Sequence, residues 1–231
     1  MFRCYGRSGR FSPVKTSCPF FRQALPQPGQ PGSFIRLLHA SPGTHTADVY
    51  LDNIPVALGV AFKGFTGYMR ILPGRHNIKV LPAGNTERIL LDTYISIPAR
   101  AVLTGAIIGL PPRIGIKTFF ETVVQIPPGR LRLRFSNLVP GSADMDLVMS
   151  GGQMLFEGVS YGKATNYESI PAGTYAFYIR QSDTGRSLLH VPGTRFAEGR
   201  FFTIYAVGQT GGGIPLQPLI LLDGNSYIQT G

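Results

Sequence analysis

The chain has 231 residues, of which 43% are hydrophobic, and this is enough for each of two domains to bury a core of ordinary size. Charged residues make up only 15%, below the usual quarter of a soluble chain, which indicates a surface that is covered or that associates. The formal net charge of +10 suits nucleic acid, anionic membrane or acidic polymers as partners, and no apolar run reaches the ~18 residues of a membrane-spanning helix.

Residues 1–32 are predicted to be a flexible basic arm. They contain no acidic residue, since the first carboxylate of the chain is Asp48. The arm ends in a segment rich in Pro, Gly and Gln, residues 27–33, which can form neither a helix nor a central strand and so is typical of a linker. The arm is either a solvated tail or a source of electrostatic contacts through its basic residues. These residues are Arg3, Arg7, Arg10, Lys15 and Arg22.

Both cysteines of the chain, Cys4 and Cys18, lie in this arm. Because the arm contains no His or Asp, the two thiols cannot complete a four-ligand zinc site. They are either free thiols or crosslinks between neighbouring molecules. Prolines and Arg22 interrupt any apolar segment near the N-terminus, so no signal peptide is expected. We therefore expect synthesis in the cytoplasm (of a mother cell, for a spore protein) and release by a route such as lysis.

Short runs rich in β-branched and aromatic residues follow the arm and predict strands, because turn residues separate them. Residues 77–80 and 131–135 alternate apolar with polar side chains, as a half-buried strand requires. In the first half of the chain the predicted strands are residues 34–39, 47–52, 65–72, 76–81, 88–97 and 101–109.

The second half repeats this plan. Residues of one type recur at a constant spacing of 99 positions, as in Thr104 and Thr203 or Gly109 and Gly208. The repeat predicts two antiparallel β-sandwich domains of immunoglobulin-like or transthyretin-like type, at 33–126 and 130–231, joined by a short, stiff segment. The predicted strands of the second half are residues 131–137, 143–149, 164–170, 174–181, 186–191, 200–208 and 218–222.

The start of each repeat carries a recognisable motif. Residues 39–43 read His-Ala-Ser-Pro-Gly and are followed by Ala-Asp-Val-Tyr-Leu-Asp at 47–52, while residues 137–140 keep the plan loosely as Asn-Leu-Val-Pro. In these segments the chain resembles the bacterial family called domain of unknown function 4397. The resemblance implies secreted or surface-displayed β-sandwich modules, often in tandem, without established catalytic residues.

The same motif contains His39, Ser41, His45 and Asp48, a set that could suggest a catalytic triad or a metal site. The second repeat has no histidine there, so a shared catalytic set is disfavoured and a loop held by side-chain hydrogen bonds is favoured. Asp144 and Asp146 lie two positions apart on a predicted strand, so both side chains would point to the same face. That face is either solvated or, less favoured, part of a calcium site. The predicted structural loop motif comprises His39, Ser41, Pro42, Asp48, Asn137, Pro140 and Asp144.

Two further features have alternative interpretations. The equivalent aromatic residues Phe62 and Tyr161 are either core residues or part of a surface that stacks on sugars or bases. The glycine-rich segment 208–213 lacks the Gly-Lys-Ser/Thr end of a phosphate-binding loop, so we interpret it as a hairpin connection.

The sequence therefore predicts a protein that is not an enzyme and has no cofactor and no metal. The leading hypothesis is a structural or assembly protein of a bacterial cell or spore surface (a spore coat, a spore appendage or an extracellular filament), whose copies are joined through the arm. The alternative is a binding module for anionic cell-wall or exopolysaccharide polymers. Nucleic acid is disfavoured as a partner because no reading element accompanies the basic residues.

Overall fold

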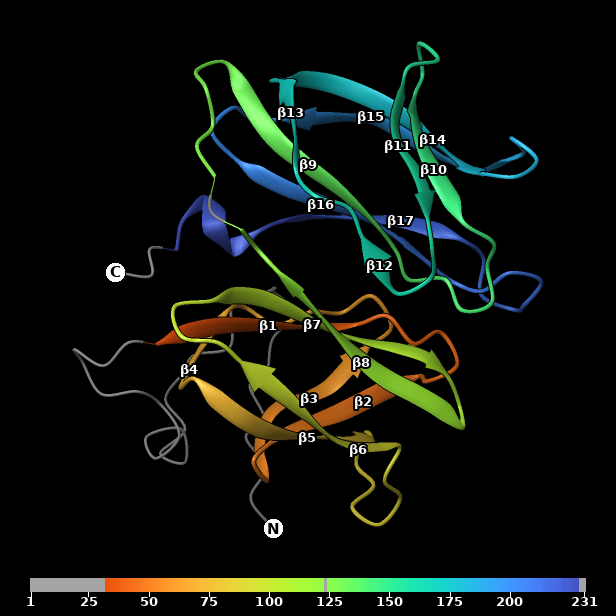
Figure 1. Ribbon diagram of the computed structural model, residues 1–231. Coiled ribbons are helices and arrows are strands. Elements are labelled where there is room, and N and C mark those ends of the chain that lie inside the picture. The colour runs from red at the N-terminus through yellow and green to blue at the C-terminus, as the bar shows by residue number, and fades with distance from the viewer. Residues whose placement is uncertain (1–31, 123, 229–231) are drawn as a thin grey trace, which may run out of the picture.

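The computed structural model describes residues 32–122 and 124–228, which fold into two β-sandwiches in tandem (Figure 1). The predicted all-β class and the duplicated sandwich are confirmed. Apart from strands, the described residues form one short 3-10 turn, η2 (Gly224–Ser226), directly after the last strand.

The first sandwich consists of two four-stranded sheets, with strand orders β4-β1-β7-β8 and β3-β2-β5-β6. Three of the connections between the two sheets contain proline, at Pro42, Pro73 and Pro98, while residues 65–68 of a predicted strand belong to a connecting loop instead. Its strands are β1 (Ser33–His39), β2 (Thr46–Leu51), β3 (Ile54–Ala61), β4 (Met69–Ile71), β5 (Gly74–Pro82), β6 (Leu91–Ile97), β7 (Val102–Leu110) and β8 (Arg113–Phe120).

The second sandwich repeats this arrangement, with strand orders β12-β9-β16-β17 and β11-β10-β14-β15, and β13 also pairs with β9. Its strands are β9 (Arg130–Asn137), β10 (Met145–Met149), β11 (Met154–Val159), β12 (Lys163–Ala164), β13 (Glu168–Pro171), β14 (Gly173–Gln181), β15 (Ser187–Phe196), β16 (Phe201–Val207) and β17 (Gln217–Leu222).

Two features of the sheets differ from the sequence-based expectation. β1 pairs with β7, and β9 with β16, in parallel, so one sheet of each sandwich is mixed. This is sterically possible because the strands of the other sheet provide the long crossover that a parallel pair needs. In addition, β3, β8 and β11 were not predicted. All three lie at sheet edges, and each contains a glycine that interrupts the alternation of side chains.

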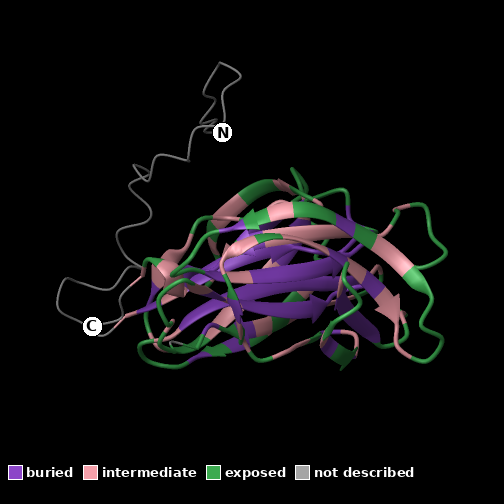
Figure 2. Cartoon of the chain, turned by 90° about the horizontal axis from the view of Figure 1, so that it is seen from above, coloured by how far each residue is buried: buried purple, intermediate pink, exposed green. Residues whose placement is uncertain are grey.

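The four sheets are stacked as four layers, and the two mixed sheets lie in the middle and face each other (Figure 1). Each sandwich has its own core between its two sheets. Because the middle sheets are covered on both faces, β7 is buried almost continuously. Figure 2 shows buried strands through the centre of the molecule and exposed segments at its periphery. The low proportion of charged residues in the chain follows partly from this second covered face.

Candidate functional site

The predicted loop motif surrounds His39, which is 1% exposed at the end of β1. Its Nδ1 accepts a hydrogen bond from the Ser41 backbone N–H at 3.3 Å. The Ser41 hydroxyl instead donates to the Gly109 carbonyl at 2.7 Å, so it is not directed at the imidazole. Burial lowers the pKa of His39 to about 4, which keeps the ring neutral at neutral pH. This geometry fixes a turn and contains no serine–histidine pair.

In the second repeat Asn137 holds the equivalent loop. Its Oδ1 accepts from the Val139 N–H at 3.1 Å, and its Nδ2 donates to the Val159 carbonyl at 3.1 Å. The two prolines of the motif lie in the turns that follow, Pro42 buried and Pro140 half-buried.

Asp48 joins strand β3 to the turn after β5 by accepting from the backbone N–H groups of Gly59 at 2.7 Å and Gly84 at 2.9 Å. Its counterpart in the second sandwich is Asp146, which accepts from the Gly158 N–H at 2.8 Å. Asp144, which the sequence pattern placed in this role, is exposed and precedes β10. Asp144 and Asp146 therefore do not form one solvated face, because Asp146 is 5% exposed.

The remaining predicted residues lie outside the part of the chain that the structure describes. Among residues 32–122 and 124–228, no group of three or more His, Cys, Asp and Glu side chains is placed to hold a metal ion. Within the same residues there is no helix of the length and hydropathy needed to cross a bilayer. The residues outside the described part are Cys4, Cys18, Arg3, Arg7, Arg10, Lys15 and Arg22.

A second buried site lies in the seam, which we define as the contact between the two middle sheets. Its apolar part consists of buried residues from both sandwiches, with the half-buried Phe62 and Tyr161 packed against them. The buried residues are Leu38, Ala40, Ala106, Ile108, Phe119, Leu138, Tyr205, Val207 and Leu221.

The polar part of the seam contains two buried arginines in equivalent positions, Arg36 on β1 and Arg134 on β9, each 3% exposed. Arg36 Nη1 donates to the carbonyl of Leu222, the last residue of β17, at 2.8 Å. Arg134 Nη1 donates to the carbonyl of Phe120, the last residue of β8, at 2.7 Å. Each arginine thus holds the end of the other sandwich's edge strand, and the contact has approximate twofold symmetry.

The residues that follow these strand ends, Glu121 and Asp223, are the buried carboxylates of the seam. Asp223 Oδ1 accepts from Arg36 Nη2 at 3.0 Å, while its Oδ2 accepts from the hydroxyls of Tyr167 and Thr203. Asp223 therefore joins both sandwiches through one side chain.

Glu121 begins in the equivalent way, since its Oε1 accepts from the hydroxyls of Tyr68 and Thr104. Its Oε2, however, accepts from the backbone N–H of Gly224 at 2.7 Å and does not reach Arg134. Burial and the charge of Asp223 raise the pKa of Glu121, and burial also raises the pKa of Tyr68. The phenols therefore remain protonated and act as donors.

Arg134 is consequently less completely paired than Arg36. All three guanidinium nitrogens of Arg36 donate hydrogen bonds. Arg134 Nη2 has no hydrogen-bond partner among the described residues, and its nearest acidic oxygen, Asp223 Oδ2, is 3.8 Å away. Burial is the largest single influence on Arg134 and lowers its pKa, but Asp223 and the neighbouring tyrosines and Glu121 together outweigh burial, so the pKa lies above the ordinary value.

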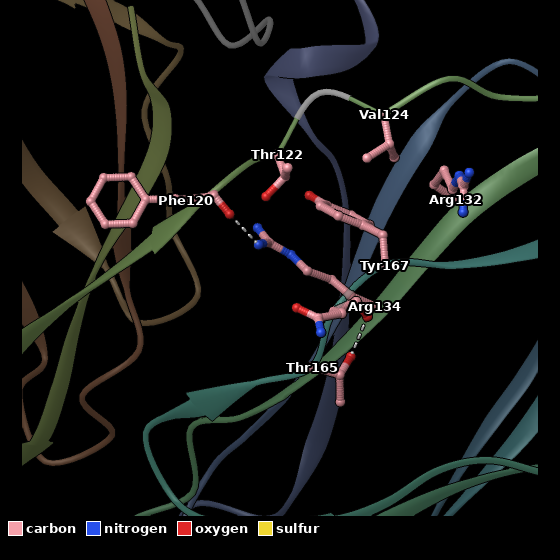
Figure 3. Close-up of a pocket in the computed structure, with 8 residues that line it drawn as sticks. Phe120, Thr122, Val124, Arg132, Arg134, Thr165 and Tyr167 are labelled. Carbon is pink, nitrogen blue, oxygen red and sulfur yellow. Dashed lines mark hydrogen bonds between the residues drawn. The ribbon is translucent and has the colours of Figure 1, made fainter. Parts of the chain in front are cut away.

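A pocket of about 260 Å³ adjoins this incompletely paired arginine. Figure 3 shows the Arg134 guanidinium extending toward the Phe120 carbonyl, with Arg132 on the other side of the Tyr167 ring. Arg132 on the same strand also lines the pocket, and its buried Nε has no partner among the described residues. The lining residues are Phe120, Thr122, Val124, Arg132, Arg134, Thr165, Asn166 and Tyr167.

A more open groove lies between the edge strands β6 and β8 of the first sandwich, with a volume of about 690 Å³. Its lining is mostly apolar and includes the exposed rings of Tyr94 and Phe120, which are 56% and 45% exposed. Both strands lie at sheet edges, so each has one side without a strand partner among the described residues.

The repeat pattern did contain a signal for the seam. Arg36 and Arg134, Tyr68 and Tyr167, and Thr104 and Thr203 recur at matching positions, and polar residues that recur on strands indicate a shared polar contact. The partners Glu121 and Asp223 could not be found in this way, because different residue types occupy the two positions and a different number of residues precedes each.

Comparison with solved structures finds distant likenesses to carbohydrate-binding modules. A family 26 carbohydrate-binding module from Eubacterium rectale, in complex with maltoheptaose, has 8% identity and a TM-score of 0.27, covering 81% of this chain and 96% of that one. Family 41 carbohydrate-binding modules from streptococcal virulence factors, described for α-glucan recognition, give 12% identity and a TM-score of 0.29, covering 85% and 100%. These neighbours are binding modules and not catalytic domains, and with TM-scores this low no ligand is inferred from them.

Comparison with curated proteins finds no match. The family described as domain of unknown function (DUF4397) matches residues 33–147 and again residues 131–231. These two segments contain the two sandwiches, and the resemblance seen at the His-Ala-Ser-Pro motif is thereby confirmed. The chain therefore belongs to the DUF4397 family, of which it carries two copies in tandem.

Proposed function

We propose that this protein is a non-enzymatic binding module that holds an anionic polymer of a bacterial surface at the pocket in the seam. The observation that carries the proposal is a pocket of about 260 Å³ whose described lining residues include two arginines, Arg132 and Arg134, and no acidic residue. Arginine side chains bind carboxylate and phosphate groups through charge-assisted hydrogen bonds, so this lining would favour an anionic group of a polymer. The formal net charge of +10 would also favour the approach of a polyanion.

Binding without catalysis is supported by the composition of the pocket. None of the described residues that line it carries a carboxylate or an imidazole, the usual general acids and bases. The Tyr167 hydroxyl is engaged as a donor to Asp223 at 2.6 Å, and burial raises its pKa further above the ordinary value. Ser41 and His39 lie in a separate loop and are held by backbone groups.

Retention on immobilised polyglucuronate, compared with neutral dextran, tests this proposal in a salt gradient to about 1 M NaCl. We expect retention on the anionic polymer only, with elution as salt rises, for the full chain and for a variant lacking residues 1–31. Arg132→Gln should elute earlier than Arg186→Gln, which removes the same charge from an exposed site in the same sandwich. Equal elution of these two variants, or no retention of either protein, would contradict the proposal.

Assembly at a cell or spore surface is a second candidate function, favoured by the groove between β6 and β8. Edge strands with a free side can accept an extended segment by main-chain hydrogen bonds. Ser33, close to the first described residue, lies beside this groove, since its hydroxyl donates to the carbonyl of Pro98, which lines the groove. The arm of a neighbouring copy is the proposed occupant, with Cys4 and Cys18 available to crosslink subunits.

The mass in solution and negative-stain microscopy, each with and without reductant, test the assembly. Ordered oligomers that loosen on reduction, and that are absent when residues 1–31 are deleted, are the expected result. A monomer under both conditions, or assemblies unchanged by the deletion, would exclude a role of the arm.

A further inference from the structure

We infer that the groove between β6 and β8 takes an aromatic side chain from residues 16–21 of a neighbouring copy, a segment that reads Thr-Ser-Cys-Pro-Phe-Phe. The inference names the segment that docks in the assembly proposed above as the second candidate function, and it rests on that function. The two sandwiches differ in the core beside this groove, and the difference indicates what the groove accepts.

The second sandwich fills its core with aromatic rings, whereas the first does not. Among the described residues that form the core of the first sandwich, none is aromatic, and the packing there is made by aliphatic side chains. The buried phenylalanines in the core of the second sandwich are Phe135, Phe156, Phe177 and Phe196.

Three equivalent positions carry phenylalanine in the second sandwich and an aliphatic residue in the first. In the second sandwich the ring centroid of Phe196 lies 6.0 Å from that of Phe177 and 5.1 Å from that of Phe202, in edge-to-face contacts. The smaller side chains of the first sandwich leave more of the space between its two sheets unfilled. The pairs, each 99 positions apart, are Ile78 and Phe177, Ile97 and Phe196, and Leu103 and Phe202.

The less filled part of the first core lies at the groove. Ile97 stands between two residues that line the groove, and Leu103 pairs with Phe120, which lines it too. Ile114 and Ile116 of β8 belong both to the lining and to the core of the first sandwich. A side chain that enters this groove of about 690 Å³ would therefore contact the core directly.

The lining and the strands define the chemistry of the occupant. None of the described residues that line the groove carries a charge, so an uncharged segment is favoured. β6 and β8 are edge strands of seven and eight residues, so an extended segment can form main-chain hydrogen bonds along either of them. The groove thus suits an extended, uncharged segment that carries an aromatic ring.

Residues 16–21 fit this description by their sequence, although they lie outside the described part of the chain. They form the longest uncharged run of residues 1–31 that contains an aromatic residue, and Lys15 and Arg22 bound it. Six extended residues span about 20 Å, close to the length of β6. Neighbouring residues of an extended segment point to opposite faces, so either Phe20 or Phe21 would enter the groove. Pro19 has no N–H group, which an edge position tolerates.

Two variants of the full chain, each lacking one half of the contact, test the inference. Thr118→Trp fills the groove with a ring of its own, since Thr118 lines it from β8. Phe20→Ala combined with Phe21→Ala removes both rings of the segment. Each variant alone should associate about tenfold or more weakly than the natural protein. An equimolar mixture should form dimers, because the intact arm of the first variant fits the open groove of the second.

Matched variants and a peptide serve as controls, with the mass in solution as the measurement. Thr184→Trp places the same ring in an exposed turn of the second sandwich, and it should assemble like the natural protein. Phe2→Ala combined with Phe11→Ala removes two rings outside the segment and should also leave assembly unchanged. Thermal unfolding checks that Thr118→Trp is folded. If it is not, a peptide of residues 14–23 takes its place and should dissociate assemblies of the natural protein.

The possible failures are distinguishable. If both groove and segment variants assemble like the natural protein, this inference is overturned and the assembly function stands. If both are monomeric and do not pair in the mixture, the assignment to a neighbouring copy is overturned, and the groove belongs to the arm of its own chain. A natural protein that is monomeric at every concentration would overturn the assembly function itself.

Discussion

Arg36 and Arg134 hold the two sandwiches together reciprocally: each donates from Nη1 to the last carbonyl of the other sandwich's edge strand, at 2.8 and 2.7 Å. Only Arg36 also receives a carboxylate within hydrogen-bond distance, from Asp223. A duplicated fold has thus built one nearly symmetric contact and left one of its two ends incompletely paired. The contact that joins the two sandwiches therefore also borders the candidate binding pocket.

Replacing Asp223 should destabilise the protein strongly. Asp223→Asn removes the charge that faces Arg36 and places an amide where Tyr167 and Thr203 donate hydrogen bonds. Breaking a buried ion pair by changing one partner costs about 3–5 kcal/mol. Urea unfolding should show this loss, whereas the exposed control Asp144→Asn should unfold like the natural protein. Equal stability of the two variants would show that the seam contributes little to the fold.

Replacing the buried Tyr205 should leave the protein as stable or make it more stable, in contrast to replacing Asp223. Its hydroxyl is fully buried in the seam and has no hydrogen-bond partner among the described residues. Tyr205→Phe removes an unsatisfied group that costs about 1–3 kcal/mol, so the variant should be as stable as the natural protein or more stable. Tyr68→Phe is the matched change, and it should destabilise because the Tyr68 hydroxyl donates to Glu121 and accepts from the Gly224 N–H. The midpoint of thermal unfolding, measured for both variants and the natural protein, shows whether each change stabilises or destabilises the fold.

Much of the fold could be predicted from the sequence because the chain contains two versions of it. Matched turns such as those at Gly109 and Gly208, with φ of 97° and 119°, identify the same backbone geometry in both repeats. Lys63 and Gly162 also match, although one is basic and the other has no side chain. Both have positive φ, 68° and 73°, so the backbone conformation explains the pairing.

The candidate site could be predicted only in part. Arg36 and Arg134 recur in the repeats, but the sequence does not show that the two sandwiches bury them against each other. The hydrogen bond from Gly224 to Glu121, which leaves Arg134 incompletely paired, joins residues 103 positions apart. Such a contact depends on how the two domains meet, and a periodic pattern within one domain carries no information about it.

The turn glycines predict local strain on substitution. A Cβ atom at Gly109 would lie 2.2 Å from the Arg113 carbonyl oxygen, and one at Gly208 would lie 2.4 Å from that of Pro215. Gly109→Ala and Gly208→Ala should each cost about 1–3 kcal/mol or more, as a strained backbone and a steric overlap together require. Gly115→Ala is the control, because nothing lies within 4 Å of its Cβ position. Chemical denaturation that ranks all three alike would contradict the assignment.

His39 predicts acid sensitivity of the first sandwich. Burial lowers its pKa from 6.5 to about 4, so the unfolded chain binds a proton that the folded chain does not bind between these values. The stability from the neutral ring is complete above pH 6.5 and is lost as pH falls through about 4, by on the order of 3 kcal/mol. His39→Asn, which introduces the residue of the second repeat, should abolish this dependence. Unfolding curves from pH 7 to about 4 measure it, and an equal slope for both proteins would exclude His39 as its source.

The central claim is that the seam pocket binds an acidic group through Arg134. A crystal structure of the full chain grown with glucuronate tests it most directly. The predicted result is one sugar in the pocket, with its carboxylate in contact with the arginine side chains that line it. An empty pocket, with glucuronate bound elsewhere or not at all, would contradict the claim.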